Sequence, residues 1–300
     1  MRILSFFLLG LVFSCSSGKV KDSTSTQVQG VNKESFKKEK TLNSGEFKDF
    51  FHKKEKSLNP ALQDETLDRY TAEELAKMSD SADPLIEIAL RCSKKDFNNA
   101  FAAANKVFNR YQKIPAYWNL IANCHLNQGS GRKALLFYNK AIEVSPGYVP
   151  ALNNIGVYYS RIGEDQKALL AFEKANRQSP FSKTPRYNLA RLYLIYDLVE
   201  SALPLFKGLL NESLNDLDLI NAVGSCYFLM SDYQSAFYHF NRIPATFLSN
   251  AEFGLNFALT LKKLGKVPEA QKLYSNIDEP KNRDLKEYYT SIGNQLGVNK

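Results

Sequence analysis

Amide side chains recur along this chain at a fixed spacing. Asn119, Asn153 and Asn221 fall on one register of a 34-residue step, and Asn154 and Asn188 fall on the register that follows it. Because an amide both donates and accepts hydrogen bonds, a row of asparagines can pair with the backbone of an extended peptide of any sequence. The same residues could instead be solvated surface groups, or could join one helix to another.

Charged and apolar residues accompany these amides. Arg161 and Arg191 would supply positive charge to an acidic peptide. Asn123 adds a further amide to the candidate binding residues. Large side chains in the same stretch would act as apolar anchors if the fold leaves them uncovered: Tyr187, Leu194, Phe228 and Leu229.

Signatures of an enzyme are scarce. His52, His125 and His239 are far apart in the sequence, whereas a metal site needs several convergent ligands. No glycine-rich phosphate loop or nucleophile elbow is present. We therefore expect a protein that is not an enzyme and that needs no metal or other cofactor. Three cysteines are expected to be buried small apolar residues rather than disulfide partners or nucleophiles: Cys92, Cys124 and Cys226.

An internal repeat in the sequence predicts the secondary-structure elements that position these side chains. Six alanines are each 34 residues apart: Ala100, Ala134, Ala168, Ala202, Ala236 and Ala270. Aromatic residues follow five of them four positions later: Tyr138, Phe172, Phe206, Phe240 and Tyr274. Small residues let two helices of a unit approach each other, and the larger ones fill the space between units. The period therefore predicts stacked pairs of antiparallel helices.

This pattern resembles the tetratricopeptide repeat, and residues 149–182 match it almost throughout, from Leu152 and Gly156 to Pro180. The resemblance implies an all-α, right-handed superhelical solenoid whose first helices line a concave groove holding the candidate residues named above. Chaperone-binding members of the family hold a carboxylate between two asparagines and basic residues. Asn123 and Asn154 match those asparagines, but the basic partners are absent.

The domain boundaries follow from the same pattern. We expect six helix-turn-helix units over residues 81–284, of which 81–114 is degenerate, and a C-terminal capping helix over 285–300. A short lead-in helix is expected within residues 64–80, where Thr71 and Glu74 form a capping box.

The N-terminus reads as a leader followed by a tether. Residues 1–14 form a short apolar signal segment, and the run from Val12 to Cys15 resembles the lipobox of bacterial lipoproteins. That resemblance implies acylation of Cys15, and Ser16 after it favours the outer membrane. Residues 15–63 have too few apolar side chains for burial to offset the conformational entropy lost on ordering, and they are expected to form a disordered tether. An ordinary cleaved signal is the alternative.

Charge argues against a nucleic-acid partner. The net charge is +8 over 300 residues, but residues 81–300 hold 26 basic against 19 acidic side chains without a basic block. We expect a non-catalytic envelope scaffold that binds protein or peptide segments and is held on a membrane by its N-terminal lipid. A lipobox followed by such repeats resembles the pilotin lipoproteins of type IV pilus secretins. An adaptor that recruits murein enzymes and an uncharacterised envelope enzyme are the alternatives.

Overall fold

The computed structural model describes residues 76–77 and 83–298. Within these ranges the regular elements are helices and no strand occurs, which confirms the all-α prediction. The predicted leader, Cys15, the tether and His52 lie outside the described residues, as does most of the predicted lead-in helix. The α-helices are α3 (Pro84–Ser93), α4 (Phe97–Tyr111), α5 (Pro115–Asn127), α6 (Gly131–Val144), α7 (Val149–Arg161), α8 (Asp165–Gln178), α9 (Lys183–Ile195), α10 (Val199–Glu212), α11 (Leu217–Leu229), α12 (Tyr233–Phe240), α13 (Ala251–Lys263), α14 (Val267–Ser275) and α15 (Arg283–Leu296).

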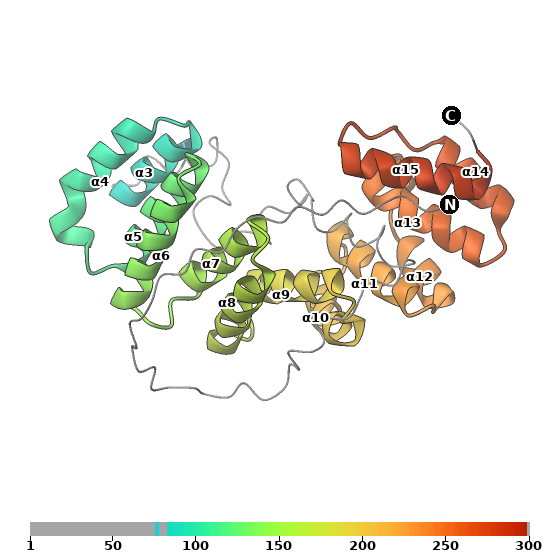
Figure 1. Cartoon of the computed structure of the whole chain (residues 1–300), viewed down its shortest axis with the longest axis horizontal. Helices are drawn as coiled ribbons and strands as arrows, with labels where there is room; N and C mark the ends of the chain where they lie inside the picture. The colour runs from blue at the N-terminus through green and yellow to red at the C-terminus, as the bar shows by residue number, and fades with distance from the viewer. Residues whose placement is uncertain (1–75, 78–82, 299–300) are drawn as a thin grey trace, which may run out of the picture. The chain divides into compact units, whose positions relative to one another are not determined.

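The helices form successive hairpins, which Figure 1 colours in chain order. We call α3, α5, α7, α9, α11 and α13 the first helices, and α4, α6, α8, α10, α12 and α14 the second helices. Each first helix packs against its own second helix, and each second helix packs against the first helix that follows it. A hairpin therefore buries its apolar faces on both neighbours, as the repeat requires.

One turn geometry closes all six hairpins. The residue between the two helices has a positive φ at every unit: Lys95, Gly129, Gly163, Asp197, Ser231 and Gly265, each 34 residues apart. The following N–H then donates to the carbonyl five residues before it, as Asp96 does to Arg91 at 2.9 Å and Lys266 does to Leu261 at 2.9 Å. Only three of these positions are glycine, so the other three hold the left-handed conformation against side-chain crowding.

Small residues set how closely the two helices of a unit approach. The six repeat alanines of the second helices are fully buried. In α7, a Cβ built on Gly156 would lie 2.5 Å from Cε1 of Phe172 in α8, and Gly224 stands in the same relation to Phe240 at 2.7 Å. A glycine at these positions makes room for the aromatic ring, which explains why small and aromatic residues recur together.

The buried apolar residues divide into two cores. The N-terminal core runs from Ile86 in α3 to Ile155 in α7, and the C-terminal core runs from Tyr187 in α9 to Leu296 in α15. Leu169 and Phe172 of α8 are buried between these sequence ranges and belong to neither core.

The last hairpin is covered by α15. Tyr289 of this helix stacks on Tyr274 with ring centres 4.7 Å apart, and its carbonyl accepts a hydrogen bond from the Tyr274 hydroxyl at 3.0 Å. Ile292 is fully buried in the same contact. The helix spans Arg283–Leu296, against the 285–300 expected from the sequence.

A covalent bond joins the first hairpin to the second. Cys92 of α3 and Cys124 of α5 form a disulfide, with Cα atoms 5.4 Å apart. The prediction that both are merely small apolar residues is therefore wrong. Cys226 is free and buried, as expected for a core residue.

Among the described helices, none combines the length and the apolar character needed to cross a membrane.

Candidate protein-binding surface

The asparagines of the first helices are joined to one another across successive units. Nδ2 of Asn154 lies 3.3 Å from Oδ1 of Asn119 and 3.4 Å from Oδ1 of Asn123. Asn153 donates to Asn154 at 3.1 Å and accepts from Asn188 at 2.8 Å. All five are buried, with exposed fractions of 5% or less. The structure therefore uses these amides as hydrogen bonds between α5, α7 and α9; contact with a peptide backbone stays a prediction.

The pattern continues in the C-terminal units with other partners. Asn221 of α11 donates to the Glu252 carbonyl at 3.3 Å, and Asn256 of α13 donates to Ser225 at 3.3 Å. The Tyr288 hydroxyl of α15 donates to Oδ1 of Asn256 at 2.9 Å. Asn221 and Asn256 thus link α11 to α13, and Asn256 also links α13 to α15.

Two buried amide atoms on the first helices have no hydrogen-bond partner among the described residues. They are Nδ2 of Asn123 and Oδ1 of Asn221. Oδ1 of Asn123 does accept from the Tyr138 hydroxyl. An unpaired buried polar group costs about 1 to 3 kcal/mol, so each of these atoms lowers the stability that its helix contact would otherwise have.

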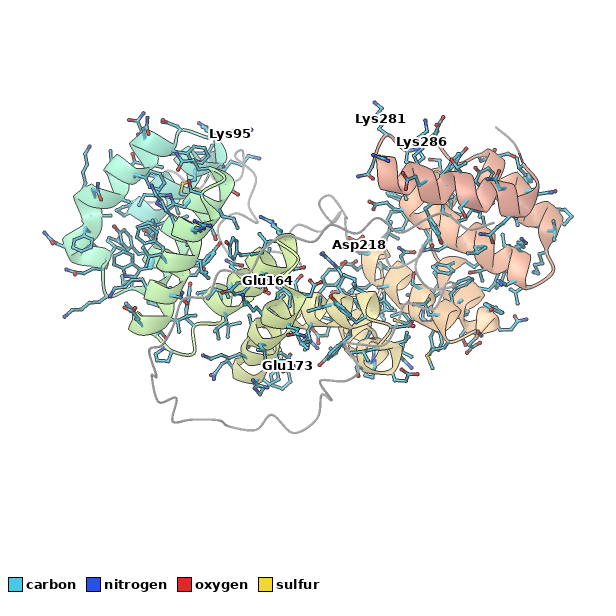
Figure 2. All side chains as sticks on the ribbon, viewed as in Figure 1. Lys95, Glu164, Glu173, Asp218, Lys281 and Lys286 are labelled. Carbon is cyan, nitrogen blue, oxygen red and sulfur yellow. A yellow bond between two sulfur atoms is a disulfide. The ribbon has the colours of Figure 1, made fainter. Side chains whose placement is uncertain are left out.

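Acidic residues and tyrosines form a second polar set between α8 and α9. The Tyr196 hydroxyl donates to the buried carboxylate of Asp165, and the Tyr193 hydroxyl donates to Oε1 of Glu173 at 3.4 Å. Burial and the neighbouring carboxylate raise the pKa of Tyr193 to about 12. Figure 2 shows Glu173 on α8. Neither carboxylate was among the predicted site residues, because a charged side chain on such a helix usually lies on its solvated face.

We call the five asparagines of α5, α7 and α9, together with Asp165 and Glu173, the polar joint. Its members come from three consecutive hairpins, and they extend from within the N-terminal core to the start of the C-terminal core in the sequence. A buried polar network of this kind fixes the register of the helices, since each hydrogen bond is formed at one relative position only.

The positive charges of the two candidate arginines interact with each other. Arg161 is exposed at the end of α7, and Arg191 is half-buried in α9. Burial lowers the pKa of Arg191, and the positive charge of Arg161 lowers it further, whereas Tyr187 and Asp165 act in the opposite direction. An anionic group brought to this place would relieve the repulsion between the two guanidinium groups.

Two of the four predicted apolar anchors are covered. Tyr187 and Leu194 have exposed fractions of 4% and 1%, because both pack into the C-terminal core. These two therefore do not meet the condition for an apolar anchor, which was that the fold leaves the side chain uncovered. Phe228 and Leu229 are half-buried at the end of α11.

The described histidines pack against aromatic rings. His125 is stacked between Phe101 and Phe137, with centres 4.4 and 5.1 Å apart, and His239 stacks on Tyr227 at 5.5 Å. Burial is the main cause that lowers the pKa of both imidazoles. Within the described part of the chain, no group of three or more His, Cys, Asp or Glu residues is placed to hold a metal ion.

Curated proteins match parts of this sequence. The General transcriptional corepressor trfA of Dictyostelium discoideum is 32% identical over 93 residues, which is 29% of this chain and 7% of that protein. Anaphase-promoting complex subunit CDC16 of Saccharomyces cerevisiae is 21% identical over 203 residues, covering 65% of this chain and 24% of its own length. The chain thus spans less than a quarter of either relative. No protein-family model matches the sequence.

Solved structures match the fold over nearly their whole length. YrrB, described as a TPR protein with an unusual peptide-binding site, has a TM-score of 0.53 at 20% identity and covers 63% of this chain and 98% of its own. PilW, described as a widely conserved type IV pilus biogenesis factor, has a TM-score of 0.52 at 18% identity, covering 67% of this chain and 94% of its own. With the six equivalent hairpins, these matches define the fold as a tetratricopeptide-repeat solenoid.

Proposed function

We propose that this chain is a non-catalytic scaffold that binds a protein or peptide segment on the surface of its first helices. The observation that carries the proposal is the succession of six equivalent hairpins, which repeats the same side-chain positions at 34-residue steps. Such an array offers a partner an extended surface, and its neighbours of known structure include one described as having a peptide-binding site.

The partner that this surface fits best carries an acidic group. Arg161 and Arg191 come from consecutive first helices and repel each other. An acidic segment would therefore gain charge-assisted hydrogen bonds from the two guanidinium groups.

In-cell crosslinking tests this binding surface. A photoreactive residue placed at Ser160, which is half-buried on α7 beside Arg161, should capture a partner. The same residue at Gln166, exposed on α8, is the control and should capture much less. Equal capture from both positions would contradict the proposal.

A pair of substitutions tests the acidic partner. Arg161→Gln with Arg191→Gln should weaken binding of the captured segment at least about tenfold, since each charged hydrogen bond is worth about 1.5 to 3 kcal/mol. The exposed Arg132→Gln is the control and should leave binding unchanged. Unaltered affinity in the double variant would remove the arginines from the site.

We further propose an envelope location with a lipid on Cys15. The support within the described residues is the disulfide between Cys92 and Cys124, because disulfides persist in oxidising compartments. Cys15→Ser should release the protein from membranes and abolish incorporation of labelled palmitate. Unchanged fractionation and labelling would refute the lipid anchor but would leave the binding surface untouched.

Assistance in assembling a pilus or secretion complex is the process we propose. The likeness to PilW supports it at the level of the fold. Affinity capture followed by mass spectrometry should recover components of a secretin ring. Recovery of murein enzymes instead would favour the adaptor interpretation and would contradict the pilus assignment.

A further inference from the structure

The second helices differ in charge between the two ends of the array. Helices α4, α6 and α8 carry eight basic and three acidic side chains, whereas α10, α12 and α14 carry two basic and three acidic ones. Of the three acidic residues in the first group, Asp165 and Glu173 are buried and accept hydrogen bonds from Tyr196 and Tyr193. Among the carboxylates of these three helices, Glu143 alone is therefore exposed.

Most of the basic groups on this side are not neutralised within the described residues. Glu143 pairs with Lys140 at 2.6 Å, and Glu164 pairs with Lys167 at 3.1 Å. Lys106, Lys133 and Lys174 are exposed and form no ion pair with any described side chain. The exposed surface of α4, α6 and α8 is therefore positively charged.

Exposed leucines lie between these lysines at the same register of two hairpins. Leu136 of α6 is 65% exposed and Leu170 of α8 is 56% exposed. Each has a lysine three residues before it and another four residues after it, and residues at these spacings share one face of a helix. We call this surface the basic-apolar face: Lys133, Leu136, Lys140, Lys167, Leu170 and Lys174.

The composition of this face selects among possible occupants. Lysine is depleted in protein–protein interfaces, and leucine is under-represented among their energetic hot spots. At a membrane surface the two types work together, since aliphatic side chains enter the headgroup layer while lysine stems lie along it with their ammonium groups in water. Anionic headgroups complement the unpaired positive charges.

We propose that the basic-apolar face of α6 and α8 binds the anionic headgroup surface of a membrane. Leu136 and Leu170 enter the headgroup layer, and Lys133 and Lys174, which form no ion pair with a described side chain, contact the lipid phosphates. This contact would leave the first helices, which are on the other side of each hairpin, available to a protein partner. It does not depend on a partner binding there, nor on acylation of Cys15.

Environment-sensitive fluorophores test the proposal in the full chain. The chain carries Cys15→Ser to remove the acylation site, and one of Leu136→Cys, Leu170→Cys or Phe181→Cys provides the label position. Cys226 is buried, and burial raises its pKa to about 12, so it does not compete for the label. Phe181 is the matched control, because it is 87% exposed in the loop after α8.

With vesicles of phosphatidylcholine mixed with phosphatidylglycerol, labels at positions 136 and 170 should shift to shorter wavelength and the label at 181 should not. Vesicles of phosphatidylcholine alone should give no shift, and high salt should reverse it. A shift at all three positions, or at none, would overturn the proposal. Protection of positions 136 and 170 by a protein in cells, without a vesicle response, would also overturn it in favour of an acidic protein partner.

Removing two positive charges from this face, or two from elsewhere, distinguishes a contact at the face from an effect of the net charge. Lys133→Gln with Lys174→Gln should weaken partitioning to the anionic vesicles about 30-fold, from about fivefold for each lysine near the lipid surface. Lys207→Gln with Lys272→Gln removes the same charge from exposed positions on α10 and α14 and should change partitioning less than about twofold. Equal weakening by both pairs would overturn the proposal.

Discussion

The two apolar cores and the polar joint hold neighbouring hairpins together by different physical means. In the N-terminal core, Tyr117 and Ala122 are almost fully buried, and a disulfide adds a covalent constraint. In the C-terminal core, Phe240 and Phe253 are fully buried, and α15 closes the end. In the polar joint, buried amides and carboxylates add hydrogen bonds between neighbouring hairpins.

The difference teaches that one repeat pattern can serve two kinds of contact. Apolar burial is non-directional and tolerates small shifts, whereas hydrogen bonds between buried amides require one register. The unit that matches the repeat most fully, residues 149–182, supplies Asn153 and Asn154 to the polar joint. We therefore expect the two cores to stabilise the ends of the array and the joint to fix the alignment of the middle hairpins.

The largest expected effect is the loss of stability on reducing the disulfide, and it should be confined to the N-terminal core. Reduction of the disulfide should lower the free energy of unfolding by about 3 to 4 kcal/mol, because it frees a loop between residues 32 apart in sequence. Hydrogen exchange should accelerate in α3 to α5 and remain unchanged in α11 to α14. Cys226→Ala, which removes no crosslink, is the control. Uniform acceleration along the chain would show that the cores are not distinct.

The next effect concerns the polar joint. Asn154→Ala should cost about 1 to 3 kcal/mol, because it removes the donor shared by Asn119 and Asn123 and the acceptor of Asn153. Denaturant unfolding measures the loss. Asn99→Ala is the control, since Asn99 is exposed and bonds only Asp96 among described partners. If both variants lose the same amount, the joint adds nothing beyond a surface hydrogen bond.

A smaller effect should be the same in both cores. Lys95→Gly in the first hairpin and Ser231→Gly in the fifth should each raise stability by about 1 kcal/mol, since glycine adopts positive φ without crowding. Gly163→Ala, at the equivalent turn, should lower it by a similar amount. Thermal unfolding measures all three. A gain at one turn and a loss at the other would mean that the hairpins are not equivalent.

The smallest expected effect is a dependence on pH. Burial lowers the pKa of His125 in the N-terminal core, helped by Lys133, and that of His239 in the C-terminal core, helped by Arg242 and Lys207. The unfolded chain then binds more protons below pH about 6.5, so stability should fall as the pH drops through that value. Urea midpoints near neutral and mildly acidic pH measure the fall. His125→Phe and His239→Phe should each reduce it, and an unchanged slope would contradict the assignment.

How far sequence could predict this molecule depends on the residue. Positions such as Ala134 and Ala168 were predicted to lie where the two helices of a hairpin approach, because their spacing is set within one unit. The sequence could not decide whether Asn154 and Tyr187 face a groove or are buried between helices, since both arrangements fit the same 34-residue spacing. Their burial depends on how closely α5, α7 and α9 approach one another.

By itself, the amino-acid sequence determined the helical hairpin, its repetition and its order, because a 34-residue period constrains neighbours along the chain. Tertiary structure alone decided the bond between Cys92 and Cys124, the network of the polar joint and the hydrogen bond from Tyr196 to Asp165. Each of these needs two atoms from different hairpins within a few ångströms, and that distance is set by packing between units.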